Sequence, residues 1–283
     1  MASVIEENWL LDLPSFLPEY EDGMNYGYKN KPGKNLETLL RETSNNHCMY
    51  CYSLLKNDRV NIGHLEHSIE KKLDEEHLTE CTPNIAIACP NCNLSLKRVG
   101  EQERLEKLEE AKKEFVLEVQ CDGKECKVEC ESYKKLKKEY CKKSRIILQP
   151  FGVKGENSNQ EYRIQYDVYN AEFVPSQKYS YSDEDIDYIE HHINQFKLND
   201  AGFKTKALAD FVEDVIESNP IRLDIDIRIC DRVTNSCLSS KIYNNSWFII
   251  CKDLSNQRIV SNETFDKFPG RSGMFLSFFR YFF

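Results

Sequence analysis

Two cysteine pairs set the strongest limit on how this chain folds. Cys48-Met-Tyr-Cys51 and Cys89-Pro-Asn-Cys92 are both C-x2-C motifs, and 37 residues separate them. Two residues between thiolates allow one tight turn to direct both sulfurs at a single ion, so two such turns complete a tetrahedral site. We therefore predict a structural Zn²⁺ bound by Cys48, Cys51, Cys89 and Cys92. The alternative is four buried thiols without a metal.

A closed shell of four thiolates leaves no open coordination position for a substrate. Any catalytic group must therefore lie outside the four cysteines. Four further cysteines, at positions 121, 126, 130 and 141, form a second cluster without C-x2-C spacing. That cluster is either a second structural zinc site or an ordinary helical hairpin with incidental thiols.

The composition limits the class of protein. The N-terminal residues lack the basic and apolar regions of a secretory signal, and no apolar run is long enough for a membrane span, so we expect a cytoplasmic protein that does not cross a membrane. In a reducing compartment, the 12 cysteines are better explained by metal binding and free thiols than by disulfides. The net charge of −9 excludes a uniformly basic nucleic-acid-binding protein but allows one basic face.

Hydrophobic patterning predicts an α+β protein in three segments. Residues 1–46 read as an N-terminal wrap that ends in a helix at 36–41. Residues 47–145 hold the cysteine pairs, strand-like runs at 59–67 and 84–88, one long amphipathic helix and a basic segment. Residues 146–283 form a mixed, partly β-rich region. Its expected elements are strands at 162–169, helices at 183–196 and 204–217, β-rich sequence at 221–260 and an aromatic tail at 275–283.

Polar residues between and after the cysteine pairs suggest phosphodiester chemistry. Glu66 and His67 come first, then Asn84, then Asn93 beside the last cysteine, then Lys97. A neutral imidazole can take a proton from water at physiological pH, which suits His67 as a general base. The carboxylate of Glu66 and the amide oxygen of Asn93 are ligands that Mg²⁺ or Mn²⁺ accepts. Asn84 is placed to orient the imidazole, and Lys97 to hold a phosphate as a point charge.

This order of residues, together with the flanking cysteines, resembles the HNH endonucleases in the variant that ends in asparagine. The resemblance implies a ββα-metal finger with a strand bearing His67, a second strand, and a helix that begins at the last cysteine pair. Glu66 departs from the Asp or His common at that position of the family. His64 is the rival base, whereas His47, His77 and the pair His191-His192 are expected to be structural or exposed.

Downstream, Ile146-Ile-Leu-Gln-Pro-Phe151, a polar turn at Tyr169–Glu172 and a helix ending in Phe196-Lys-Leu-Asn199 resemble PtuB-type HNH proteins of Septu and retron anti-phage systems. This resemblance covers roughly residues 40–215. It implies an endonuclease that cuts foreign nucleic acid, DNA more than RNA, beside an ABC-type ATPase of the PtuA kind. The alternatives are an RNA-cleaving toxin that acts on tRNA and a non-catalytic zinc-containing adaptor.

One strongly basic segment stands out in this acidic chain. Within 132–145 there are seven basic residues and one acidic residue, Glu139. The basic residues are Lys134, Lys135, Lys137, Lys138, Lys142, Lys143 and Arg145. Such a run either contacts nucleic acid or a partner, or forms a solvated helix face.

Overall fold

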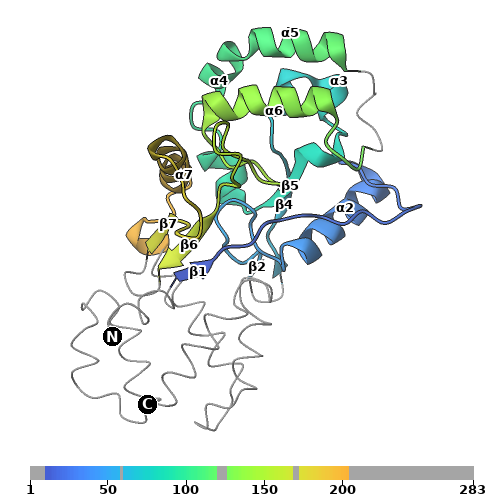
Figure 1. The fold of residues 1–283 in the computed structure, drawn as a ribbon. Coiled ribbons are helices and arrows are strands. Elements are labelled where there is room, and N and C mark those ends of the chain that lie inside the picture. Colours follow the sequence, from blue (N-terminus) through green and yellow to red (C-terminus); the bar gives the residue numbers. More distant parts are fainter. Residues whose placement is uncertain (1–9, 58–59, 120–125, 168–171, 204–283) are drawn as a thin grey trace, which may run out of the picture. The chain divides into compact units, whose positions relative to one another are not determined.

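In a computed structural model of the chain, the described residues are 10–57, 60–119, 126–167 and 172–203 (Figure 1). The chain divides into two compact units made of discontinuous segments. Unit 1 comprises Met1–Pro14, Arg163–Lys178 and Lys197–Phe283, and unit 2 comprises Ser15–Tyr162 and Tyr179–Phe196. The predicted boundaries after 46 and 145 both fall inside unit 2. The expected helix at 204–217, the β-rich sequence at 221–260, the tail and Cys121 lie outside the described residues.

The described part of unit 1 is a three-stranded antiparallel sheet in the order β1-β6-β7. Its strands are β1 (Leu10–Asp12), β6 (Ile164–Asp167) and β7 (Glu172–Pro175). The predicted strand at 162–169 is confirmed over β6, while β1 was not expected because three residues are too few to show a pattern. Asn199 extends this unit: its side-chain amide accepts from the Phe173 N–H at 2.7 Å and donates to the Phe173 carbonyl at 2.9 Å.

Unit 2 is a mixed α+β assembly with two small two-stranded sheets, β2-β3 and β4-β5. Its elements are, in chain order, α2 (Asn30–Thr43), β2 (Lys56–Asn57), β3 (Val60–Asn61), β4 (His64–His67), η2 (Lys71–Leu73), α3 (Glu75–Leu78), η3 (Thr82–Asn84), β5 (Ile85–Ala88), η4 (Cys92–Leu96), α4 (Glu101–Lys107), α5 (Glu109–Glu118), α6 (Glu131–Ser144) and α7 (Asp183–Gln195). Within the described residues, no helix combines the length and the apolar composition needed to cross a membrane.

The centre of unit 2 is the antiparallel pair β4-β5, in which His64 lies opposite Ala88 and His67 opposite Ile85. All four residues of β5 are buried, so this strand packs on both faces, and α2 lies against it. The π-helical turn η4 begins at Cys92, so a helical segment starts at the last cysteine pair as expected. The predicted strand-like runs at 59–67 and 84–88 thus contain β3, β4 and β5, and the predicted helix at 36–41 lies within α2.

The long amphipathic helix expected around Leu105–Phe115 is instead two helices, α4 and α5. The helix breaks at Leu108, whose φ of −107° and ψ of 3° are not helical. The Leu108 N–H bonds the Leu105 carbonyl, and its side chain is 1% exposed. The bend lets both helices pack against α6 (Figure 1). The hydrophobic spacing predicted helical structure correctly, but burial of Leu108 decides the bend.

Helix α7 starts where the sequence predicts it. The Ser182 hydroxyl accepts from the Asp185 N–H, and the Asp185 carboxylate accepts from the Ser182 N–H, which completes a capping box. Ile189, His192 and Ile193 then face the core of unit 2. The predicted helix at 183–196 is therefore confirmed over Asp183–Gln195.

Candidate active site and metal centre

The four cysteines of the two C-x2-C motifs come together at one buried point. The Sγ atoms of Cys48, Cys51, Cys89 and Cys92 all lie within 4.8 Å of one another, and those of Cys51 and Cys89 are 3.8 Å apart. Zn–S bonds of about 2.3 Å in a tetrahedron place sulfurs about 3.8 Å apart. The group is therefore able to bind a metal ion such as zinc with little rearrangement.

Backbone contacts bring the two cysteine turns together. In the first turn, the Cys48 N–H bonds the Ser53 carbonyl at 2.8 Å, and the Tyr52 N–H bonds the Cys48 carbonyl at 2.8 Å. The Met49 N–H bonds the Ile87 carbonyl in β5 at 3.0 Å. Since Ile87 lies two residues before Cys89, this bond holds the first turn beside the second.

The second cysteine cluster does not form a comparable site in the described residues. Cys126 and Cys130 are half-buried, and Cys141 is buried in α6. Among the described residues, the only group of three or more His, Cys, Asp or Glu side chains placed to bind a metal is the first one. Burial raises the pKa of the Cys141 thiol to about 11, which favours an uncharged thiol. Cys121 itself lies outside the described residues.

His67, the predicted general base, ends β4 and is 8% exposed. Its Nε2 lies 3.0 Å from the backbone carbonyl of Thr79. A carbonyl oxygen can only accept, so Nε2 carries the proton and Nδ1 of the neutral ring keeps its lone pair. Burial lowers the pKa of His67 to about 4, although the Thr79 carbonyl acts in the opposite direction. The ring is therefore neutral, with one nitrogen able to accept a proton, at physiological pH.

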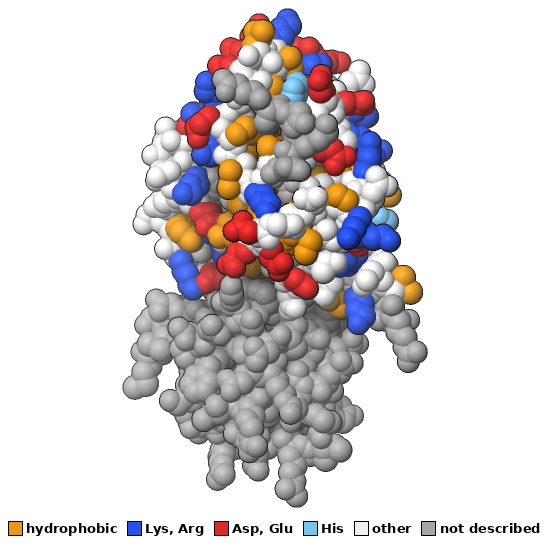
Figure 2. All heavy atoms as spheres, turned by 90° about the vertical axis from the view of Figure 1, so that its right-hand side faces the viewer, with side chains coloured by type: hydrophobic (Ala, Val, Ile, Leu, Met, Phe, Trp, Pro, Cys, Tyr) orange, Lys and Arg blue, Asp and Glu red, His pale blue; other side chains and the backbone are white. Residues whose placement is uncertain are grey.

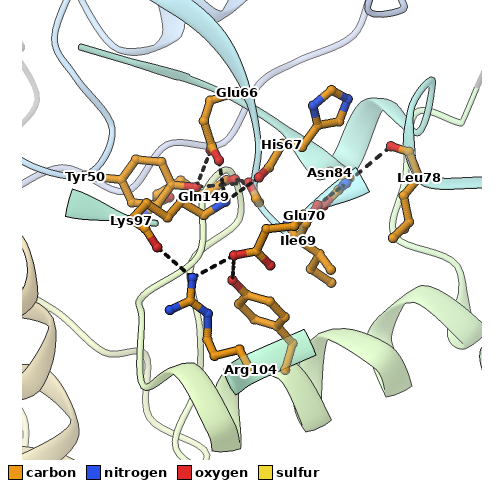
Figure 3. Close-up of polar contacts among 12 residues, drawn as sticks. Tyr50, Glu66, His67, Ile69, Glu70, Leu78, Asn84, Lys97, Arg104 and Gln149 are labelled. Carbon is orange, nitrogen blue, oxygen red and sulfur yellow. Dashed lines mark hydrogen bonds and ion pairs between the residues drawn. The ribbon is translucent and has the colours of Figure 1, made fainter. Parts of the chain in front are cut away.

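Glu66 precedes His67 but contacts a different part of the molecule, because successive side chains of a strand point to opposite faces. Figure 3 shows the imidazole directed away from the Glu66 carboxylate. That carboxylate pairs with the Lys97 ammonium and accepts from the Tyr50 hydroxyl at 2.9 Å. Burial raises the pKa of Glu66, while the Lys97 charge opposes this shift. Both carboxylate oxygens are engaged, so the structure does not present Glu66 as a ligand for a catalytic cation.

Lys97 was expected to hold a substrate phosphate, and the structure gives it another role. The residue is 3% exposed, and its ammonium donates to the Glu66 carboxylate and to the backbone carbonyl of His67. It therefore ties the residue after η4 to β4 through the Glu66 side chain and the His67 backbone (Figure 3). A buried, paired ammonium is not available to an external phosphate.

Asn84 was expected to orient the imidazole, but all its contacts lie elsewhere. Its Oδ1 accepts from the Ile69 N–H at 2.8 Å and from the Tyr133 hydroxyl at 3.0 Å. Its Nδ2 donates to the carbonyls of Ile69 at 3.0 Å and Leu78 at 3.3 Å. Asn84 is thus a fully satisfied buried amide that fixes the loop between β4 and β5. The orienting group for His67 is the Thr79 carbonyl in that loop.

Asn93, the other predicted cation ligand, is half-buried at the second position of η4. Its backbone N–H bonds the Cys89 carbonyl at 3.0 Å. Within the described residues its side-chain amide has no hydrogen bond, so that group is not committed to the core. Glu66, whose two carboxylate oxygens are engaged by Tyr50 and Lys97, is not free to join it at a cation site.

A second buried polar cluster adjoins the Glu66–Lys97 pair and was not anticipated. Arg104 of α4 donates to the Glu70 carboxylate at 2.7 Å, and the Tyr140 hydroxyl donates to the same oxygen at 2.7 Å. Arg104 also donates to the Lys97 carbonyl at 2.6 Å. The neighbouring cations outweigh burial and lower the pKa of Glu70. These contacts join α4, α6 and the chain after β4, which a sequence pattern does not reveal because the residues are far apart in the chain.

The remaining histidines agree with structural roles. His64 is exposed at the start of β4, and the His77 Nδ1 lies 2.7 Å from the Asp74 carboxylate. The His47 Nδ1 lies 2.7 Å from the Asn45 carbonyl. Buried His192 accepts from the Ile147 N–H at 3.0 Å and donates to the Tyr50 carbonyl at 3.2 Å. These contacts place His192 in the core rather than in a metal site.

The basic run lies on α6 and its C-terminal end, and acidic side chains accompany it. Lys134 pairs with Glu131 at 2.7 Å, and Lys135 with Glu118 at 2.7 Å. The further pairs are Lys137–Glu129, Lys138–Glu156, Lys142–Glu139, Lys142–Glu156 and Arg145–Asp187. On the face drawn in Figure 2, basic and acidic side chains are likewise interleaved. These contacts favour the interpretation as a solvated helix face.

Comparison with known proteins adds no relative. The chain matches no family model, no curated protein and no solved structure. The function must therefore be argued from the residues and their geometry.

Proposed function

We propose that this protein is an HNH-type endonuclease that hydrolyses phosphodiester bonds, with His67 as the general base. The observation that carries the proposal is the hydrogen bond from His67 Nε2 to the Thr79 carbonyl. This bond selects the tautomer in which Nδ1 can take a proton from water, and burial keeps the ring neutral at physiological pH. The core residue His192 also donates to a backbone carbonyl, but of the two only His67 lies in the strand pair that leads into the second cysteine turn.

The surrounding frame supports the same proposal. His67 ends a strand that pairs with β5, β5 leads into the second cysteine pair, and η4 begins at Cys92. This order of strand, strand, zinc-binding turn and helix is the one that the resemblance to HNH endonucleases implies. The zinc would act structurally, because four thiolates complete its coordination.

The expected catalytic cation, Mg²⁺ or Mn²⁺, does not fit the arrangement of its predicted ligands. Glu66 is held by Lys97 and Tyr50, and only Asn93 keeps a free amide. We therefore assign no chemical step to a cation. The cleavage assay compares reactions with and without added Mg²⁺ or Mn²⁺ and so shows whether cleavage requires a divalent cation.

The substrate class and partner in this proposal come from the resemblance to PtuB-type proteins. We propose foreign nucleic acid, DNA in preference to RNA, as the substrate and an ABC-type ATPase of the PtuA kind as the partner. The net charge of −9 supports a partner, because non-specific nucleic-acid affinity depends on basic surface. The lysines of α6 add little free basic surface, because they pair with acidic side chains.

A non-catalytic zinc-containing adaptor is the second candidate. It is favoured by the Glu66–Lys97 pair and by the four internal hydrogen bonds of Asn84, which engage three of the predicted site residues in the core. The two candidates differ in one respect that can be measured, since only the nuclease needs a reactive His67.

The test is cleavage by the wild type, His67→Ala and His64→Ala. Each is assayed alone and with co-purified partners on plasmid, linear DNA and tRNA, with and without Mg²⁺ or Mn²⁺. His67→Ala is expected to lower the rate by about 10²–10⁴-fold with unchanged zinc content, whereas exposed His64→Ala changes it little. No cleavage under any condition would favour the adaptor, whereas equal rates of cleavage for His67→Ala and the wild type would show that His67 is not the general base. Cleavage of tRNA alone would identify the RNA-directed alternative.

A further inference from the structure

The ring of Tyr28 covers His67. The centroids of the two rings are 4.3 Å apart, with the planes inclined by 49°. Tyr28 belongs to the segment before α2, and His67 ends β4, so this contact joins parts of the chain that are far apart in sequence. Together with the Thr79 contact, it leaves His67 only 8% exposed.

Residues 20–29, here called the strap, carry Tyr28 over the surface. Residues 21–25 are exposed, while Tyr26 and Gly27 are buried. The Tyr28 N–H donates to the Glu80 carboxylate at 2.8 Å. The ammonium of Lys71 lies 5.6 Å from the centroid of the Tyr28 ring. Glu80 and Lys71 both come from the connection between β4 and β5, so the backbone and the ring of Tyr28 are both attached to that connection.

A second set of contacts holds the other half of the strap. The Lys127 ammonium donates to the Glu21 carbonyl at 2.7 Å and lies 5.9 Å from the centroid of the Tyr26 ring. The Tyr20 and Tyr26 rings pack edge to face at 5.3 Å. Hydrogen bonds, cation–π contacts and ring packing hold the strap, and each such contact is individually weak at an exposed site. Tyr26 is buried whereas Tyr28 is only half-buried, so the Tyr28 end of the strap can separate from the surface while Tyr26 stays in the core.

The end of the strap depends on a close approach at Gly33 in α2. A Cβ at position 33 would lie 2.6 Å from the Tyr28 carbonyl oxygen and 2.9 Å from its carbon. Both are backbone atoms, so a larger residue must displace Tyr28 itself. Alanine has the higher helix propensity, so Gly33→Ala should move Tyr28 while α2 stays folded.

We propose that the strap is a built-in cover that controls access to His67, and that it opens when a phosphodiester substrate enters. The nucleolytic part of this statement rests on the proposed function. A general base must come within hydrogen-bond reach of the water that it activates beside the substrate. The Tyr28 ring occupies one face of the imidazole, so a bulky substrate reaches that face only after the ring leaves. Opening would also free the Lys71 ammonium for phosphate.

Access to His67 can be measured without any nuclease assay. The zinc-loaded full chain is treated with diethyl pyrocarbonate, and acylation of His67 is followed by peptide mass spectrometry relative to exposed His64 in the same sample. Tyr28→Ala removes the ring and its contact with Lys71, and Gly33→Ala displaces the Tyr28 backbone that bonds Glu80. Each variant should raise the relative rate at His67 by about tenfold, as expected for loss of one such contact from the cover. Tyr28→Phe keeps a ring and should remain slow. Gly202→Ala is the matched glycine control, because a Cβ there meets nothing within 4 Å.

Unchanged acylation in both Tyr28→Ala and Gly33→Ala would overturn the cover. Faster acylation together with faster cleavage supports it fully. Faster acylation with cleavage reduced in both variants would overturn it as a cover and make Tyr28 a positioning residue. Faster acylation in a chain that cleaves nothing, wild type included, would support control of access to His67 while the proposed nuclease function fails.

Discussion

Glu66 and His67 are neighbours in the chain, yet their side chains lie on opposite faces of β4. The Glu66 carboxylate is paired with Lys97, while the imidazole of His67 bonds the Thr79 carbonyl. Lys97 also donates to the His67 backbone carbonyl. The buried pair therefore ties β4 to the residue after η4, and it leaves neither charge free for a substrate or a cation.

The first prediction concerns the metal. Protein purified without added zinc should contain one tightly bound zinc per chain, and Cys48→Ser or Cys92→Ser should lose it and unfold the region around β4 and β5. Structural zinc is worth about 10–16 kcal/mol in small zinc-dependent folds, so folding and binding are coupled. Metal analysis and circular dichroism test this.

Cys130→Ser is the matched control, because Cys130 is half-buried and outside the four-cysteine group. It should keep one zinc and the wild-type fold. A fully folded zinc-free wild type would refute the assignment, and a second zinc that Cys130→Ser removes would establish a site in the second cluster.

The second prediction separates a structural Lys97 from one that binds phosphate. Lys97→Met leaves the buried Glu66 charge unpaired and should reduce the free energy of unfolding by about 3–5 kcal/mol. The double variant Glu66→Gln with Lys97→Met removes both charges and should recover much of that loss. Urea denaturation of the wild type, Lys97→Met, Glu66→Gln and the double variant measures the coupling.

Cleavage gives the complementary readout for the same proteins. If Lys97 only supports β4, the double variant keeps activity whenever it keeps stability. Loss of activity in a double variant as stable as the wild type would return Lys97 to the role of a phosphate ligand.

The third prediction concerns acid stability. Burial lowers the pKa of His192 to about 3, whereas an unfolded histidine has a pKa near 6.5. Below about pH 6.5 the unfolded state therefore binds more protons than the native state, so stability falls as the pH drops toward 3. His192→Asn can still accept from the Ile147 N–H but cannot titrate.

At pH 7 the free energy of unfolding of His192→Asn should be lower than that of the wild type. It should also vary less with pH. The difference in slope between wild type and His192→Asn should approach about 1.4 kcal/mol per pH unit near pH 5. Chemical denaturation at several pH values checks this, and parallel slopes for the two proteins would contradict a buried neutral His192.

The fourth prediction concerns the lysines of α6. Combined substitution of Lys134, Lys135, Lys138 and Lys142 by Gln should leave nucleic-acid affinity and its salt dependence unchanged, because acidic partners already accompany these ammonium groups. Each lost phosphate contact would lower the slope of log affinity against log salt by roughly 0.7–0.9. Binding titrations at several salt concentrations measure it.

The comparison is the salt dependence of binding by Lys31→Gln and Lys34→Gln. The described residues show no ion pair for these two lysines. A change of two or more units in the slope for the α6 variant, with none for Lys31→Gln and Lys34→Gln, would establish α6 as a nucleic-acid contact after all.

Local features of the chain were readable in advance. The spacing of the cysteine pairs predicts a four-sulfur cluster because each pair needs only one turn, and the cluster is found. Helix α7 begins at a capping box formed by Ser182 and Asp185, three residues apart. Each cysteine turn and the capping box depend on neighbours within one turn of the chain, so they can be predicted locally, whereas the meeting of the two cysteine turns depends on the distant Met49–Ile87 contact.

The partners of the candidate base depend on distant contacts instead. The Thr79 carbonyl is a backbone group, which no side-chain pattern can reveal, and Tyr28 meets His67 only through a tertiary contact between distant parts of the chain. Glu66 and Lys97 read as a cation ligand and a phosphate ligand while burial is unknown. Once both are removed from water, each is the other's strongest available partner, and the ion pair follows from the cost of leaving either charge alone.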